Sequence, residues 1–439
     1  MSNFISIILN RFDEHMLDVI KGTFQSFVMR VLGAALGFAV SISIGRLLGV
    51  EDAGVYFLAL SVAAIATAFG KLGFDFTSVR FIAALNYKKD MGGIRGIYTS
   101  INNAVLVSSI IVGVIICTFA LWIMEETLLK QELIVPLILV GICITPLSLL
   151  TIQANALRGL RKIPESEWFK TGFIPFVTLL FLIPFTNWWG VNGAVAAYAL
   201  STIIVFLAVA SYWAHCLKGH SGNYKPVSKA ELFASSWPSL VVTISAVVIT
   251  QTPFIFLSLW GSNQDLGLYG AANRISALLL FPLMAAISIL APKFSMLFHS
   301  DEHVSLEQMA QRSSILLTAI GLPLVVIVFF CSEWILSFFG EGFILGVDVL
   351  HILLIGAFLN MATGAIGELL MMTGNEKSAR NAHIIAALIV ISGCIIFIPL
   401  YGLVGAAWSV NLGIIIQNLL MIFMVKKQLN FWPLGIGIK

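Results

Sequence analysis

Charged residues are scarce in this chain. Asp, Glu, Lys and Arg make up 11% of its 439 residues, whereas about 25% is usual for a soluble protein. Hydrophobic residues make up 59%, and the mean hydropathy is +0.97. A water-soluble core cannot bury that much apolar surface, so a lipid bilayer is the solvent that fits. The net charge of +3 is too small to indicate a nucleic-acid partner.

Cysteine pairs and enzymatic motifs are also lacking. The five cysteines lie in or beside apolar runs and none forms a Cys-x-x-Cys pair, so disulfide and metal roles have little support. There is no phosphate-binding glycine loop, no HExxH and no aspartate-rich loop motif. We therefore expect no enzymatic activity, no metal and no cofactor. A membrane-embedded glycosyltransferase or polymerase, which needs a long catalytic loop, is kept as an alternative from another functional class.

Long apolar runs, in contrast, are plentiful. A helix needs about 20 apolar residues to cross a bilayer core of about 30 Å. The sequence predicts an all-α membrane protein with about twelve such helices. They are expected at 22–48, 53–79, 98–123, 133–157, 167–186, 190–217, 234–260, 266–297, 312–339, 345–373, 379–400 and 402–425.

Positive charge gathers in every second loop. Lys and Arg are concentrated after the even-numbered predicted helices and in both tails, whereas the other loops hold only Arg46 and Lys130. Because basic loops stay on the cytoplasmic side, we predict that both termini are cytoplasmic and that the protein lies in the bacterial inner (plasma) membrane. Apolar and charged residues mix at the N-terminus, which predicts an amphipathic helix on the membrane surface.

The two halves of the chain repeat one another. Gly54 and Gly267 each stand two residues before a tyrosine, and Arg80 and Lys293 each end a predicted helix; both pairs lie 213 residues apart. Parallel repeats imply a pseudo-two-fold axis along the membrane normal, with a substrate path in a central cavity between two pseudo-symmetric six-helix lobes. The predicted segments are an amphipathic segment at 1–21, an N-lobe at 22–217, a cytoplasmic linker at 218–233, a C-lobe at 234–425 and a cytoplasmic tail at 426–439.

Four short segments carry a family resemblance. They read RLLGVEDAGVY at 46–56, GFDFTSVR at 73–80, GLYGAANR at 267–274 and YGLVGAA at 401–407. In order and spacing they resemble the polysaccharide (O-antigen repeat-unit) flippases of the multidrug/oligosaccharidyl-lipid/polysaccharide exporter superfamily. The resemblance extends over the whole chain. It implies a V of two lobes that flips an undecaprenyl-diphosphate-linked oligosaccharide from the cytoplasmic to the periplasmic leaflet by alternating access.

The same resemblance bears on partners. It implies a lipid-linked oligosaccharide as substrate, surrounding membrane lipids, and a polysaccharide polymerase and chain-length regulator as candidate partners of a monomer. Cation-coupled multidrug exporters share the architecture and remain an alternative. Such an exporter would be expected to carry acidic residues in its cleft, whereas basic residues dominate the deep positions of this chain.

Three cations lie deep inside predicted helices, several residues from either end, where a charge costs about 2.5–3.5 kcal/mol on insertion scales. Arg30 and Arg274 each lie about nine residues, hence about 13 Å, into a helix. Because guanidinium groups match phosphate oxygens, we predict that Arg30, Arg274 and Lys71 are cavity cations for a diphosphate or an acidic sugar. A structural ion pair or a snorkelling side chain is the alternative for each arginine.

Four further charged residues have two interpretations each. Arg80 and Lys293 are most simply interfacial anchors, and they are also candidates for holding the headgroup at the cytoplasmic mouth. Asp75 and Glu368 are candidates for proton or sodium coupling. Asp75 can instead form a salt bridge with Lys71, four residues earlier, and Glu368 can be a hydrogen-bonded structural carboxylate.

Overall fold

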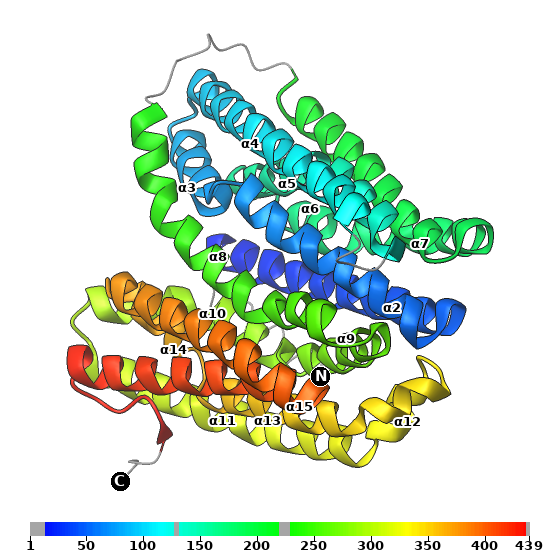
Figure 1. Cartoon of the computed structure of the whole chain (residues 1–439). Helices are drawn as coiled ribbons and strands as arrows, with labels where there is room; N and C mark the ends of the chain where they lie inside the picture. Colours follow the sequence, from blue (N-terminus) through cyan, green and yellow to red (C-terminus); the bar gives the residue numbers. More distant parts are fainter. Residues whose placement is uncertain (1–13, 127–130, 219–228, 436–439) are drawn as a thin grey trace, which may run out of the picture.

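The computed structural model describes residues 14–126, 131–218 and 229–435, and within these ranges the chain is helical and contains no strand (Figure 1). The predicted all-α architecture is therefore confirmed. The α-helices are α2 (Glu14–Gly70), α3 (Phe74–Tyr87), α4 (Met91–Glu126), α5 (Ile134–Gly159), α6 (Ile163–Glu167), α7 (Phe173–Cys216), α8 (Lys229–Trp260), α9 (Asn263–Leu278), α10 (Phe281–His299), α11 (His303–Phe330), α12 (Ser332–Ser337), α13 (Val347–Ala362), α14 (Ile366–Met372) and α15 (Glu376–Leu429). Three short helices join them: η1 (Gln131–Leu133), η2 (Trp168–Gly172), which is a π-helix, and η3 (Glu341–Gly346).

The described helices account for the predicted number of membrane crossings. Nine helical stretches within the described ranges are long and apolar enough to span a bilayer. Three of them, which contain α2, α7 and α15, are double-length and turn back at Gly49, Gly190 and Gly402, where the backbone leaves the helical region. Counting each of these three twice gives twelve crossings.

Four of the predicted spans are interrupted in the structure: 53–79, 266–297, 312–339 and 345–373. The first breaks at Gly73, whose φ is +73° and whose Cα lies against α8; an added Cβ would be 2.5 Å from the Ser236 carbonyl oxygen. The second stops at Leu278 and restarts at Phe281, directly before Pro282. A proline nitrogen donates no hydrogen bond, which favours a helix start at this point.

Other predicted boundaries also shift. The span predicted at 312–339 begins at His303 and ends at Phe330. Residues 219–228 of the predicted linker lie outside the described residues, and Lys229 already begins α8. Residues 1–13 of the predicted amphipathic segment also lie outside them, and from Glu14 onward the chain is part of α2.

Two groups of helices make up the molecule (Figure 1). The N-lobe contains α2 to α7, and the C-lobe contains α8 to α15. α8 packs along α15 in the C-lobe and along α2 and α3 in the N-lobe. Its first turns contact α3 through the Phe74 and Phe233 rings, whose centroids are 5.4 Å apart. The space between α2, α7, α8 and α9 is where the two lobes meet.

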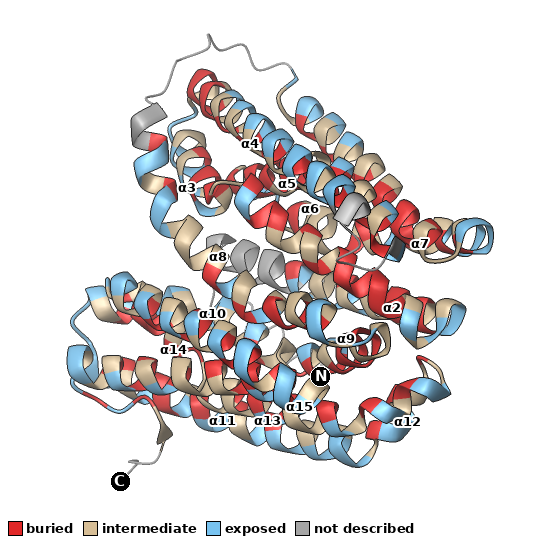
Figure 2. Cartoon of the chain, in the orientation of Figure 1, coloured by how far each residue is buried: buried red, intermediate tan, exposed pale blue. Residues whose placement is uncertain are grey.

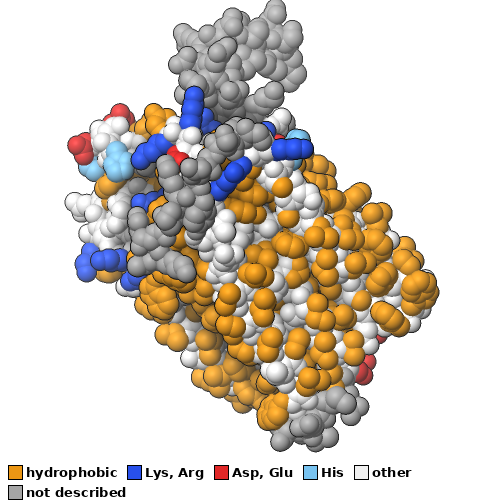
Figure 3. All heavy atoms as spheres, turned by 90° about the horizontal axis from the view of Figure 1, so that it is seen from above, with side chains coloured by type: hydrophobic (Ala, Val, Ile, Leu, Met, Phe, Trp, Pro, Cys, Tyr) orange, Lys and Arg blue, Asp and Glu red, His pale blue; other side chains and the backbone are white. Residues whose placement is uncertain are grey.

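The outer surface suits lipid. On α4, Val107, Ile111 and Ile115 follow at four-residue steps, and each is more than half exposed, at 59%, 54% and 58%. Figure 2 shows exposed residues along the outward side of this helix. In Figure 3 hydrophobic side chains cover most of one face of the molecule, and Lys and Arg gather at one end of it. We call this the basic end; it carries the loops after α3, α5 and α10.

Candidate functional site

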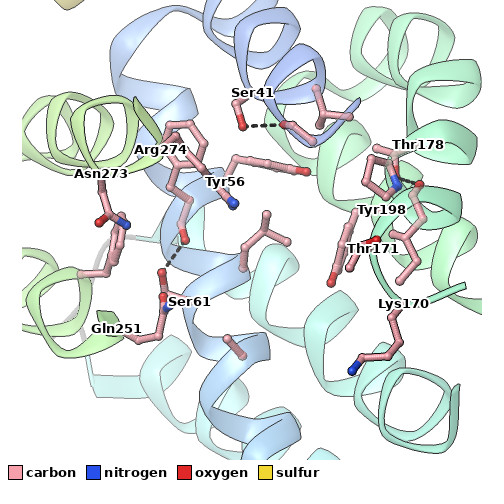
Figure 4. A pocket seen from close by; sticks show the side chains of 18 residues that line it. Ser41, Tyr56, Ser61, Lys170, Thr171, Thr178, Tyr198, Gln251, Asn273 and Arg274 are labelled. Carbon is pink, nitrogen blue, oxygen red and sulfur yellow. Dashed lines mark hydrogen bonds between the residues drawn. The ribbon is translucent and has the colours of Figure 1, made fainter. Parts of the chain in front are cut away.

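A pocket of about 350 Å³ lies between the lobes. We call it the central pocket. α2, η2 and α7 form its N-lobe wall, and α8 and α9 form its C-lobe wall. Its polar lining, shown in Figure 4, consists of Ser41, Tyr56, Ser61, Lys170, Thr171, Thr178, Tyr198, Gln251, Asn273 and Arg274. A polar cavity bounded by membrane-spanning helices is expected at a substrate path.

Four hydroxyl groups of the central pocket have their protons engaged within their own helical stretch. The Thr171 hydroxyl donates to the Glu167 carbonyl at 2.8 Å. The Ser41 hydroxyl donates to the Gly37 carbonyl at 3.0 Å, Ser61 to the carbonyl four residues earlier at 2.8 Å, and Thr178 likewise at 2.8 Å. Each hydroxyl oxygen therefore keeps acceptor lone pairs. Such oxygens can accept hydrogen bonds from the hydroxyl groups of a sugar.

Arg274 supplies the guanidinium of the central pocket. It follows Asn273 on α9, is exposed, and has no ion pair among the residues that the structure describes (Figure 4). Ser61 on α2, the residue 213 positions earlier, lines the same pocket. Both pseudo-symmetric halves therefore contribute a residue to the pocket lining at matching positions of the repeat. No described Asp or Glu belongs to the pocket lining, so its charge is positive.

Lys170 is a second cation of the central pocket, and sequence reasoning did not select it. Its ammonium donates to the Asn155 amide oxygen at 3.3 Å, and Asn155 donates to the Asp75 carboxylate at 3.0 Å. Lys71 pairs with the other Asp75 oxygen at 3.0 Å. The predicted Lys71–Asp75 pair is thus present, and a hydrogen-bonded chain connects it to the pocket through Lys170.

Lys170 owes its position to the π-turn η2. The sequence places a helix start at Glu167, which would leave Lys170 at the membrane surface. Helix instead begins at Ile163, so Lys170 lies more than one turn inside. π-turns occur often at functional sites. The signal available in the sequence was the pair Glu167 and Lys170, three residues apart at the start of an apolar run.

Arg30 lies in a different pocket from Arg274. This second pocket, of about 140 Å³, lies between α2, α5 and α6 of the N-lobe and α10 of the C-lobe, and we call it the basic-end pocket. Arg30 there forms two hydrogen bonds with Glu167, from Nε to Oε2 at 2.8 Å and from Nη2 to Oε1 at 3.1 Å. Arg158 lines the same pocket. In this structure Arg30 therefore forms a structural ion pair, which is the alternative that the sequence leaves open. It also lines a pocket.

The remaining predicted residues lie outside both pocket linings. Arg80 and Lys293 are exposed at the basic end. Glu368 is half-buried on α14, at the position that repeats Asn155. Asp75 touches the central pocket only through Asn155 and Lys170. The roles proposed for these residues from the sequence stay predictions.

The lobes close tightly at the end opposite to the basic end. A Cβ added to Gly54 would overlap the Asn263 carbonyl oxygen. In the same region Arg46 donates from Nε to the Phe338 carbonyl at 2.7 Å, and Asn263 donates to the Glu132 carboxylate at 3.0 Å. These contacts join α2 and η1 of the N-lobe to α9 and the α12 region of the C-lobe.

Comparison with known sequences gives two family matches. The profile of the family described as polysaccharide biosynthesis protein matches residues 19–298, and that of the MatE family matches residues 238–396. A protein of Shigella flexneri named "Putative O-antigen transporter" is 23% identical over 245 residues, which cover 55% of this chain and 57% of that protein. The match thus spans little more than half of the relative's length.

Comparison with solved structures shows the fold. An inward-facing multidrug resistance transporter of the MATE family has a TM-score of 0.69 at 15% identity, with 93% of this chain and 98% of that chain covered. A transporter of the same superfamily from Pyrococcus furiosus, described by the reverse polarity of its binding pocket, scores 0.67 at 15% identity, with 93% and 96% covered. The lipid II flippase MurJ in an inward closed conformation scores 0.66 at 16% identity, with 93% and 87% covered.

Proposed function

This chain belongs to the polysaccharide biosynthesis protein family, within the multidrug/oligosaccharidyl-lipid/polysaccharide exporter superfamily, and on that premise we propose that it flips a lipid-linked oligosaccharide across the membrane. It is a multi-pass membrane transporter with the two-lobe fold of that superfamily, and not an enzyme. The proposed substrate is an undecaprenyl-diphosphate-linked repeat unit. The proposed direction is from the cytoplasmic to the periplasmic leaflet of the bacterial inner membrane, with both termini and the basic end in the cytoplasm.

One observation carries this proposal: the guanidinium of Arg274, which has no ion pair among the described residues, lies in an intramembrane pocket lined by hydroxyl oxygens. A diphosphate needs cationic donors, and sugars need hydrogen-bond acceptors and donors. Lys170 adds a second positive charge, and no described carboxylate belongs to the lining of this pocket. The lipid tail would remain in the bilayer while the headgroup occupies the space between the lobes.

The contacts between the lobes support a rocking mechanism. The end opposite to the basic end is closed by backbone contacts between α2 and α9. Separation of these helices, with closure at the basic end, would expose the central pocket to the other side. We propose that proton or sodium coupling runs through Asp75, which reaches the pocket by way of Asn155 and Lys170, or through Glu368. We further propose a monomer that passes its product to a polymerase and chain-length regulator.

A cation-coupled drug exporter is the second candidate function. The MatE match over residues 238–396 favours it. The charge of the central pocket is against it, because a cationic drug would meet Arg274 and Lys170 without a carboxylate among the described lining residues. The two candidates therefore differ in the charge of what they transport: an anionic lipid-linked oligosaccharide for the flippase and a cationic drug for the exporter.

The test is transport in liposomes that contain the purified protein. The substrate is a fluorescent polyprenyl-diphosphate oligosaccharide, and its loss from the outer leaflet is followed by quenching. Arg274→Ala should slow flipping about tenfold or more, the size expected for losing a charge-assisted hydrogen bond. Arg312→Ala, an exposed arginine on α11 outside both pockets, is the matched control and should retain the wild-type rate. Wild-type flipping by Arg274→Ala, or transport of a cationic dye instead, would contradict the proposal.

A further inference from the structure

Glu167 is a buried carboxylate that faces a pocket. Its side chain is 3% exposed, and both of its oxygens accept from Arg30, whose side chain is 30% exposed. Both residues line the basic-end pocket. A guanidinium that binds a carboxylate through two parallel hydrogen bonds presents the same donor pair that would bind two oxygens of a phosphate. Glu167 therefore occupies the position on Arg30 that an anionic ligand would take.

The basic-end pocket has a charged wall and an apolar wall. Arg30, Glu167 and Arg158 come from the N-lobe, and Phe281 and Met284 come from α10 of the C-lobe. Arg158 is exposed and has no ion pair in the described part of the chain. One wall thus suits a phosphate, and the other suits the hydrocarbon next to it. A polyprenyl phosphate ester presents these two chemistries at adjacent atoms.

We propose that Glu167 is a built-in competitor for the substrate's phosphate. In the empty transporter it holds the Arg30 fork; when the diphosphate of the lipid-linked substrate arrives, Arg30 exchanges the carboxylate for phosphate oxygens. This inference rests on the flippase function proposed above. As a consequence, Arg30 binds the diphosphate more weakly but reversibly. When Glu167 returns to Arg30, it displaces the phosphate and favours release of the headgroup toward the central pocket.

The neighbours of Glu167 make the exchange feasible. Lys170, three residues later, and Arg158 both attract its carboxylate. A displaced Glu167 would therefore not be left as an uncompensated buried charge, which is the situation that makes breaking a buried pair costly. Because Lys170 lines the central pocket, the turn from Glu167 to Lys170 also forms the wall between the two pockets.

Binding of farnesyl diphosphate to the full-length protein in nanodiscs tests this proposal. Glu167→Gln should bind about tenfold tighter than the wild type, since the competing charge is gone. Glu167→Asp, which keeps the charge on a shorter arm, should lie between the two. Glu165→Gln is the matched control: Glu165 accepts from the Tyr212 hydroxyl at 3.2 Å, lines neither pocket, and should leave the affinity unchanged. In the liposome assay Glu167→Gln should flip more slowly despite its tighter binding.

The outcomes separate this inference from the proposed function. Equal or weaker binding by folded Glu167→Gln and Glu167→Asp, with a wild-type protein that does bind, would show that Glu167 only fixes the position of Arg30. That result would overturn the inference and leave the flippase function standing. No binding of farnesyl diphosphate by the wild type or any variant would overturn the proposed function and the inference with it.

Discussion

Gly54 of α2 and Gly267 of α9 each lie against the backbone of the other helix. A Cβ on Gly54 would overlap the Asn263 carbonyl oxygen, and a Cβ on Gly267 would overlap that of Val50. The two glycines are 213 residues apart, at matching positions of the repeat. The lobes are therefore sealed at this end by a pseudo-symmetric contact that has no room for a side chain.

Alanine at either glycine should weaken this seal. Overpacking of this kind costs about 1–3 kcal/mol, which is enough to favour lobes separated at the end opposite to the basic end. We expect the first turns of α9 to exchange amide hydrogens faster in Gly54→Ala and Gly267→Ala, and flipping to fall about tenfold. Gly367→Ala is the control, because the atom nearest to its added Cβ is 3.6 Å away. Unchanged exchange in both variants would show that the contact is not a gate.

The sequence predicted the number of crossings and the repeat because both depend on composition and spacing. Apolar runs report the bilayer thickness directly. The repeat is also visible in the backbone, because Gly190 has φ, ψ of 58°, −133° and Gly402 has 57°, −130°. The sequence also identifies Arg274 as a deep cation from its distance to the helix end, and Arg274 does line the central pocket.

The partners of the charges could not be predicted in this way. Arg30 and Glu167 are 137 residues apart, so no helical spacing relates them. The sequence predicts a span that begins only at residue 167, because the preceding segment Ile163–Glu167 contains a proline and charged residues that are typical of a loop. The break of the predicted span 53–79 at Gly73 depends on the close approach of α8. This is a tertiary contact, so the local sequence does not predict it.

Arg30→Ala should destabilise the protein more than Arg274→Ala. The first leaves Glu167, which is 3% exposed, without its two hydrogen bonds, whereas Arg274 has no ion pair among the described residues. Breaking a buried pair costs about 3–5 kcal/mol, and the partial exposure of Arg30 should reduce this to about 2 kcal/mol. Thermal unfolding in detergent measures the difference, and the double variant Arg30→Ala/Glu167→Ala should recover most of the loss. If the double variant is no more stable than Arg30→Ala, the pair is not coupled.

Asp75→Asn should also destabilise the protein, because it leaves Lys71 without its partner and brings two lysines into one network. We expect a loss of about 1–3 kcal/mol and a matching loss of transport. Lys71→Met in the same chain removes the unpaired charge and should restore both. Restored stability without restored transport would instead assign Asp75 to ion coupling, and flipping rates measured with and without a proton or sodium gradient would then identify the ion.

Gly190→Ala and Gly402→Ala provide a direct test of the repeat. At both positions φ is near +58° and ψ near −130°, a conformation that costs an L-residue about 1–3 kcal/mol. No atom lies within 4 Å of the added Cβ at either site, so backbone strain is the only cost. The two variants should therefore lose the same stability in thermal unfolding, although one turn belongs to the N-lobe and the other to the C-lobe. If one variant clearly loses stability and the other loses none, the two hairpins are not equivalent.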